Sequence, residues 1–189
     1  MGRIKITLRA ATVLMAALFL AACAGKTTVK SNLHIKGAPD WVNKGTNALN
    51  DKKGRLFHGV GIAPDIGDIS LQKDTADNRA RAEVARILSS YMEVVSKDYS
   101  TASNVDGQQI NEQEVSREIN NVTNTNLSGT KIIGRWRDKK SSTIYSLAEL
   151  DMRYVKQTVK TFRDMNDGLR KYIGQNADVS FDKFSEESR

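Results

Sequence analysis

The sequence predicts an α+β fold, in which a small antiparallel sheet of about three strands is covered by a long amphipathic helix and a C-terminal helix. Three observations support this prediction. Residues 70–99 contain no Gly or Pro and carry apolar side chains at helical spacing. Residues 55–63, 130–137 and 143–150 have the composition of strands, and turn signals separate them. Residues 151–174 repeat apolar side chains every three or four positions.

The helix predicted over residues 70–99 is the largest element. Ser70 is its expected N-cap, because a serine hydroxyl can accept a hydrogen bond from the first turn. At 100° per residue the apolar side chains gather on one face, which comprises Ala76, Ala80, Val84, Ile87, Leu88, Tyr91, Met92, Val95 and Tyr99. The other face is charged, and helical spacing predicts the pairs Asp77–Arg81, Arg79–Glu83 and Glu93–Lys97.

The strand predicted over residues 55–63 has one nearly bare face. Leu56, His58, Val60 and Ile62 alternate with Phe57, Gly59, Gly61 and Ala63. Because glycines leave room for close approach, we expect the long helix to lie on the second face, with Ala76 and Ala80 against the glycines. A phosphate-binding loop is disfavoured, since the third glycine of G-x-G-x-x-G is replaced by Pro64.

The rest of the domain is predicted as two helices and a hairpin. Residues 108–124 form a thin amphipathic helix through Val115, Ile119 and Val122. Residues 130–137 and 143–150 pair as a hairpin, with Ile132, Gly134 and Trp136 expected on the side of Ile144, Ser146, Ala148 and Leu150. Asp151 caps the last helix, Gly174 ends it, and residues 175–189 are expected to form a mobile polar tail.

The N-terminus predicts export and lipidation. Basic residues precede a short apolar run, Ala10 to Leu20, which is typical of a signal peptide. The junction Leu20-Ala21-Ala22-Cys23 resembles the bacterial lipobox, which implies cleavage between Ala22 and Cys23, a diacylglyceryl group and an N-acyl chain on Cys23, and anchoring in a membrane. Ala24 follows, where the best-known sorting rule would require aspartate for retention in the inner membrane, so we expect the outer membrane.

These signals divide the chain into four parts. Residues 1–22 are a removed signal peptide, 23–38 a lipidated cysteine with a flexible tether, 39–174 a folded α+β domain and 175–189 the tail. Trp41, near the start of the domain, is expected to plug the edge of the core. The single cysteine excludes a disulfide within the chain.

The charge of the chain does not favour nucleic acid as a partner. Of 29 basic residues, three lie in the predicted signal peptide, which leaves 26 against 22 acidic residues. This surplus of four is ordinary, and the basic residues are scattered among acids. The local concentration of positive charge at residues 135–140 is expected to be a solvated hairpin tip, with a site for anionic lipid or cell-wall polymer as the alternative.

Three motifs in order resemble the LPP-twenty lipoprotein family, to which the flagellar lipoprotein FlgP is related. They are Pro39-Asp40-Trp41-Val42, Gly59-Val60-Gly61-Ile62-Ala63, and the alanine-rich helix from Ala76 to Leu88. The resemblance covers roughly residues 39–165. It implies helices packed on an antiparallel sheet, attachment to the outer membrane and no established enzymatic activity, and flagellar members build rings or disks around the motor.

We therefore expect a non-catalytic lipoprotein of the bacterial envelope that acts as a structural or interaction protein. Two roles stay open beside it: a flagellar basal-disk component, and an outer-membrane activator of a peptidoglycan synthase. The lipid-anchored membrane is one partner, and a second copy of the chain or another envelope protein is the other. No cofactor is expected besides the lipid on Cys23, and no metal. The expected partner surface comprises Arg79, Glu83, Arg86, Arg135 and Arg137.

The sequence gives weak support to an enzyme. Asp65 and Asp68 are a candidate carboxylate pair, but their place before the long helix favours roles in the loop and the cap. His58 is expected to be a strand residue whose imidazole has a partner, and His34 falls in the predicted tether, so no metal-ligand spacing is recognisable.

Overall fold

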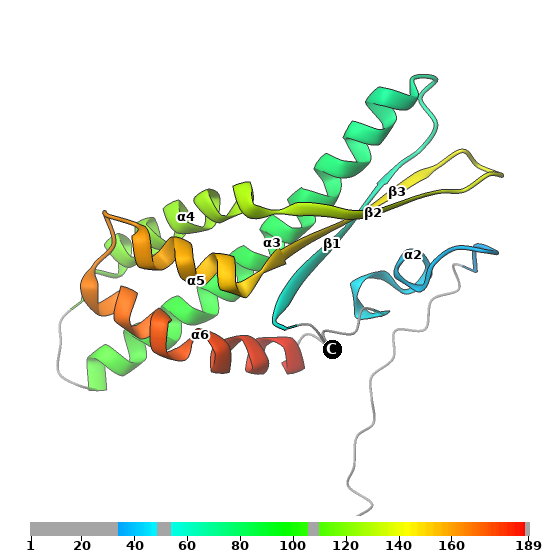
Figure 1. Ribbon diagram of the computed structural model, residues 1–189. Coiled ribbons are helices and arrows are strands. Elements are labelled where there is room, and N and C mark those ends of the chain that lie inside the picture. Colours follow the sequence, from blue (N-terminus) through cyan, green and yellow to red (C-terminus); the bar gives the residue numbers. More distant parts are fainter. Residues whose placement is uncertain (1–33, 49–53, 106–109, 188–189) are drawn as a thin grey trace, which may run out of the picture.

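The computed structural model describes residues 34–48, 54–105 and 110–187, which form a three-stranded sheet and the helices around it (Figure 1). The signal peptide, Ala22, Cys23 and the tether up to residue 33 lie outside the described residues. In chain order the elements are α2 (Asp40–Lys44), the 3₁₀ turn η1 (Gly45–Ala48), β1 (Leu56–Ala63), α3 (Ile69–Val105), α4 (Glu112–Asn126), the 3₁₀ turn η2 (Leu127–Gly129), β2 (Lys131–Arg137), β3 (Ile144–Asp151), α5 (Met152–Thr161) and α6 (Asp167–Glu187).

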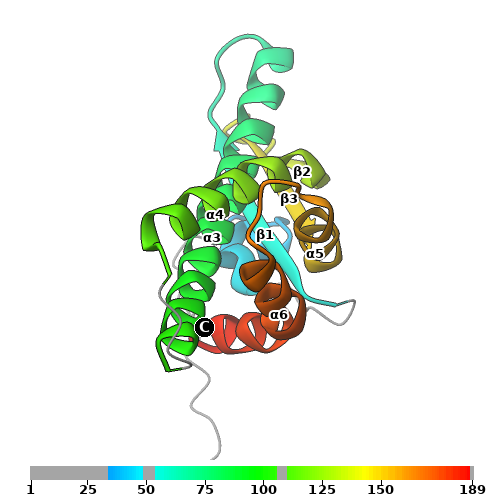
Figure 2. The ribbon, with the colours of Figure 1, turned by 90° about the vertical axis from the view of Figure 1, so that its left-hand side faces the viewer.

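The sheet has the order β1-β3-β2, and both neighbouring pairs are antiparallel. The predicted α+β class is confirmed, as is the hairpin between β2 and β3. Helix α3 runs along the whole molecule and crosses one face of the sheet, while α4, α5 and α6 gather around its C-terminal half (Figures 1 and 2).

The glycines of β1 let α3 lie directly on the strand, as the sequence predicts. A Cβ atom added to Gly59 would lie 2.3 Å from the carbonyl oxygen of Ala80, and one added to Gly61 would lie 2.1 Å from that of Ala76. Both distances are far below van der Waals contact, so any larger residue would force the helix away from the sheet.

Helix α3 begins earlier and ends later than predicted. Its N-cap is Asp68, not Ser70: the Asp68 carboxylate accepts hydrogen bonds from the backbone N–H groups of Ser70 (2.8 Å) and Leu71 (3.0 Å). Asp68 replaces Ser70 because the helix starts at Ile69, which already places Ser70 inside the first turn. Among the predicted pairs along its surface, Glu93–Lys97 is present at 2.8 Å, whereas Asp77 and Arg79 have partners in the sheet instead.

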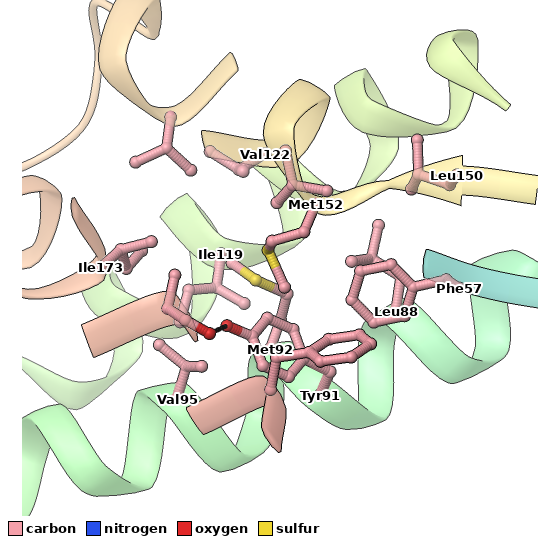
Figure 3. Close-up of a cluster of buried hydrophobic side chains, with 14 of the residues drawn as sticks. Phe57, Leu88, Tyr91, Met92, Val95, Ile119, Val122, Leu150, Met152 and Ile173 are labelled. Atoms are coloured by element: carbon pink, nitrogen blue, oxygen red, sulfur yellow. Dashed lines mark hydrogen bonds between the residues drawn. The ribbon is translucent and has the colours of Figure 1, made fainter. Parts of the chain in front are cut away.

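The main core lies between α3 and the elements that surround its C-terminal half (Figure 3). Eight of the nine predicted apolar residues of α3 are buried, and Ile87 is half-buried against the core. Ala76 lies in a small second cluster with Ala63 and Ile144. The others meet Phe57 and Leu150 from the sheet, Val115, Ile119 and Val122 from α4, and Met152, Val155 and Val159 from α5. Tyr91 donates a hydrogen bond to the carbonyl of Ala177 (2.9 Å), so its buried hydroxyl has a partner.

The C-terminal region differs from the prediction in two respects. The single helix predicted over residues 151–174 is two helices, because Asn166 starts a new one: its side chain accepts from the N–H groups of Gly168 and Leu169. Asp151 caps α5 as expected.

Gly174 does not end a helix. The prediction of a mobile tail is wrong up to Glu187, because α6 continues through Gly174 and buries Ala177 and Phe181 in the core.

A β-bulge changes which face of the sheet β2 presents. The register shifts between Ile132 and Gly134, so Ile132 lies opposite Ala148 while Gly134 and Trp136 lie opposite Leu147 and Tyr145. The prediction that Ile132, Gly134 and Trp136 share one face is therefore wrong. Because side chains alternate across a strand, the extra residue turns Arg135 and Arg137 to the face that carries α3.

The other face of the sheet is partly covered by the N-terminal segment. Trp41 in α2 packs there, with its Cζ2 atom 3.7 Å from the position of a Cβ at Gly134, which agrees with a role as a plug. Ile35 exchanges backbone hydrogen bonds with the Asn43 side chain. Residues 34–38 are thus part of the fold, and the boundary predicted at residue 39 is too late.

Candidate interaction surface

Four of the five side chains predicted as a partner surface have partners within the chain. On α3, Arg79 donates to the carbonyl of Ile62 at the edge of the sheet (2.5 Å), and Arg86 pairs with Glu83 through two hydrogen bonds (3.0 and 2.6 Å). The Arg86 guanidinium lowers the pKa of the Glu83 carboxyl. These residues lie on the solvent side of α3, where the charges of Glu83 and Arg86 compensate each other and the guanidinium of Arg79 binds a backbone carbonyl.

Arg135, the fourth of these residues, belongs to a charged cluster between α3 and the sheet. Its guanidinium forms a bidentate pair with the Asp77 carboxylate (2.8 and 2.6 Å), and the Ser146 hydroxyl donates to the same carboxylate (2.7 Å). The Asp77 side chain is 7% exposed and that of Arg135 46%. The hydrogen bond from Arg135 and that from Ser146 lower the pKa of Asp77 against the opposing effect of burial.

This cluster fixes α3 to the sheet rather than presenting a site to a ligand. The bidentate geometry is the strong form of an Arg–carboxylate pair, and Ser146 occupies a further acceptor position on Asp77. Arg137, by contrast, is exposed at the end of β2. Of these two arginines, Arg135 therefore has a structural role, and Arg137 is exposed where a partner could contact it.

The residues considered for catalysis also have structural roles. Asp65 accepts from the backbone N–H of Gly67 (3.0 Å) in the loop between β1 and α3, and Asp68 caps α3, as expected for loop and cap residues. His58 lies 3.1 Å from the carboxylate of Glu149 on the neighbouring strand. Among residues 34–48, 54–105 and 110–187, no group of three or more His, Cys, Asp and Glu side chains is placed to hold a metal ion.

One end of the molecule carries an apolar surface that the sequence did not predict. Of the seven large apolar side chains that the described residues leave most exposed, four lie within ten residues of one another, at the end of β1, in the following loop and in the first turn of α3. We call these four the apolar end: Ile62, Ile66, Ile69 and Leu71, which are between 45% and 60% exposed. A sequence signal existed, because Ile66 precedes the helix, and Ile69 and Leu71 fall outside its buried stripe.

The apolar end is continuous with the tip of the hairpin. Gln72 donates hydrogen bonds to the carbonyls of Ala63 (3.0 Å) and Ser142 (2.8 Å), which ties the end of β1 and the start of α3 to the hairpin turn. Ile62 lies opposite Tyr145, and Tyr145 lies opposite Trp136, in one row across the sheet. The Trp136 and Tyr145 rings are half-exposed with centroids 5.6 Å apart.

No protein-family model matches the chain, and no curated protein is significantly similar to it. The resemblance to the LPP-twenty family therefore stays a prediction from three motifs. Within the part of the chain that the structure describes, none of the helices has the length and apolar character needed to cross a bilayer.

Proposed function

We propose that this protein is a lipoprotein of the bacterial outer membrane, anchored through lipid on Cys23, that acts without catalysis by binding other components of the envelope. The observation that carries the proposal is the sequence Leu20-Ala21-Ala22-Cys23, directly after a basic and then apolar leader. It accounts for the place of the single cysteine of the chain.

The proposed anchor would keep the folded part of the chain near the membrane. The described structure begins at residue 34, eleven residues beyond Cys23. Fully extended, a segment of that length spans about 36 Å, since a chain reaches at most about 3.3 Å per residue. The domain would thus stand close to the membrane that holds the lipid.

The hydrogen bonding of the polar side chains also favours binding over chemistry. Asp68 and Asp77, two carboxylates near the start of α3, are engaged in a helix cap and an ion pair, and both arrangements are structural. In contrast, several large apolar side chains and the basic tip of the hairpin are exposed among the described residues, and both suit an interaction partner.

The test is metabolic labelling of the full chain with a fatty acid in a bacterial host. We expect the wild type to incorporate label and Cys23→Ala to incorporate none, because the thiol is the acceptor of the diacylglyceryl group. Ala24→Ser is the control and should be labelled like the wild type. Label on the Cys23→Ala chain would overturn the proposal.

The destination is tested by a second substitution. Ala24→Asp should move the labelled protein from the outer-membrane fraction to the inner-membrane fraction on a sucrose gradient, because the new aspartate follows the lipidated cysteine. If the wild type is already in the inner-membrane fraction, the outer-membrane part of the proposal is wrong and the lipidation part stands.

A further inference from the structure

We infer that the apolar end of the domain docks onto the surface of the lipid bilayer that carries the anchor. This inference rests on the proposed lipid anchor, because the anchor is what keeps the domain beside the membrane. It adds a second contact, made by side chains, to the covalent one. The partner that the apolar end contacts is the interfacial region of the bilayer, between headgroups and acyl chains.

The first argument is the kind of side chain that is exposed. Isoleucine and leucine are among the residues most often buried, yet Ile66, Ile69 and Leu71 stand in solvent around one loop and the first turn of a helix. Large apolar side chains that are exposed within so short a stretch of chain indicate an interaction surface. This loop protrudes beyond the sheet at the upper right of Figure 1.

The second argument is the place where the chain begins. In Figure 1 the described chain starts below the sheet, on the side of the molecule toward which the hairpin between β2 and β3 and the loop between β1 and α3 extend, whereas α5 and the start of α6 lie toward the other side. Residue 34, which follows Cys23 by eleven positions, therefore lies on the side of the molecule toward which the apolar end extends. A lipid on Cys23 would hold the domain to the bilayer from this side.

The third argument is the border of the patch. Trp136 and Tyr145 lie in the same cross-strand row as Ile62, and amphipathic rings of this kind favour the interface between headgroups and acyl chains. The basic side chains Lys139 and Lys140 follow at the hairpin turn, and both are exposed. Long basic side chains can bury their stems while the charge stays among the headgroups.

Charge predicts how this contact depends on the lipid. Residues 62–75 and 136–143 contain four basic side chains, Lys73, Arg137, Lys139 and Lys140, and four acidic ones, Asp65, Asp68, Asp74 and Asp138. These two segments are therefore neutral overall, and Arg79, which binds the carbonyl of Ile62, adds one positive charge. Binding should depend on apolar burial more than on anionic headgroups.

The experiment measures cosedimentation with vesicles of the chain from Ala24 to Arg189, which lacks lipid and leader but retains every described element. We expect binding to vesicles of phosphatidylethanolamine and phosphatidylglycerol (3:1), and to phosphatidylcholine vesicles within about threefold, because the net charge of the apolar end is small. Ile66→Asp/Ile69→Asp should lower the partition coefficient at least about tenfold. Val179→Asp is the matched control, since Val179 is exposed on α6, and should bind like the wild type.

A second measurement fixes the orientation without any substitution. Both tryptophans of the chain lie on the sheet face that borders the apolar end, so brominated lipids should quench the intrinsic fluorescence of the wild type.

The melting temperature shows whether the double variant is still folded. Because the substituted isoleucines are exposed, the double variant should keep the melting temperature of the wild type to within a few degrees.

Three results would overturn the inference: no cosedimentation of the wild type, equal binding by the double variant, or a dimer in vesicle-free solution that the double variant converts to a monomer. The last result would make the apolar end an interface between copies. Failure here is distinguishable from failure of the proposed function, because fatty-acid labelling of Cys23 and vesicle binding of the unlipidated chain are independent measurements.

Discussion

Asp77 shows how a buried charge acts on this fold at the scale of single residues. Helical spacing predicted a pair with Arg81, four residues along the same helix. The structure pairs Asp77 with Arg135 instead, and Arg81 contributes only at longer range to lowering the pKa of Asp77. This partner could not be predicted, because the bulge between Ile132 and Gly134 decides the face of Arg135, and the sequence pattern of β2 does not announce it.

Asp77→Asn should make the protein less stable at neutral pH by about 1–2 kcal/mol, since a charge-assisted pair is lost but Arg135 is half-exposed and remains hydrated. The folded-state pKa of Asp77 lies below that of the unfolded chain, near 3.9, so the contribution of its charge is present at higher pH and is lost as pH falls through the folded value. Urea unfolding gives the free energy of unfolding of wild type and variant. The difference between the two should therefore be smaller at pH 3 than at pH 7.

The matched control for Asp77 is Glu93→Gln, which removes a surface pair with Lys97. Both side chains of that pair are well exposed, so we expect no measurable change in stability at either pH. A difference between wild type and Asp77→Asn that stays constant between pH 7 and pH 3 would contradict the role assigned to the Asp77 charge.

At the scale of elements, the contact between β1 and α3 was predictable and the division of the C-terminal helix was not. Small residues at alternate positions of a strand and at i, i+4 of a helix are a local signal for close packing. The break before α6 depends on Asn166 acting as an N-cap, and residues 162–172 also satisfy the pattern of one continuous helix. The apolar periodicity over residues 151–174 is compatible with one helix and with two, so it could not decide between them.

Gly61→Ala should destabilise the protein by more than about 2 kcal/mol, because the new methyl group would meet the backbone of α3 at Ala76 and Ala80, and backbone cannot move aside as a side chain can. Gly174→Ala, in the exposed interior of α6, has no atom within 4 Å of the new Cβ and should instead raise stability by about 0.5–1 kcal/mol. Denaturant unfolding of both variants measures the contrast. Equal effects would show that α3 does not lie on the strand.

At the scale of the whole molecule, the last helix, α6, packs against the first strand, β1, in the main core. Phe181 in α6 packs edge-on against Phe57 in β1, with ring centroids 5.0 Å apart, and Arg55 pairs with Asp182 at 2.7 Å. The sequence did contain a signal for this, since Ile173, Ala177 and Phe181 recur every four residues. This signal is weak because most residues after Gly174 are polar. In sequence, a helix that buries only a narrow stripe has a composition similar to that of a solvated tail.

Phe181→Ala should destabilise the protein by about 3–5 kcal/mol, because the truncation leaves a cavity beside Phe57 and Tyr91 that the surrounding helices cannot fill. For a chain of this size that loss lowers the melting temperature by roughly 10 °C. Val179→Ala, two residues away and exposed, should leave the melting temperature unchanged. A mobile tail would give no effect for either variant, so a normal melting temperature for Phe181→Ala would remove α6 from the core and with it the contact that links the two ends of the fold.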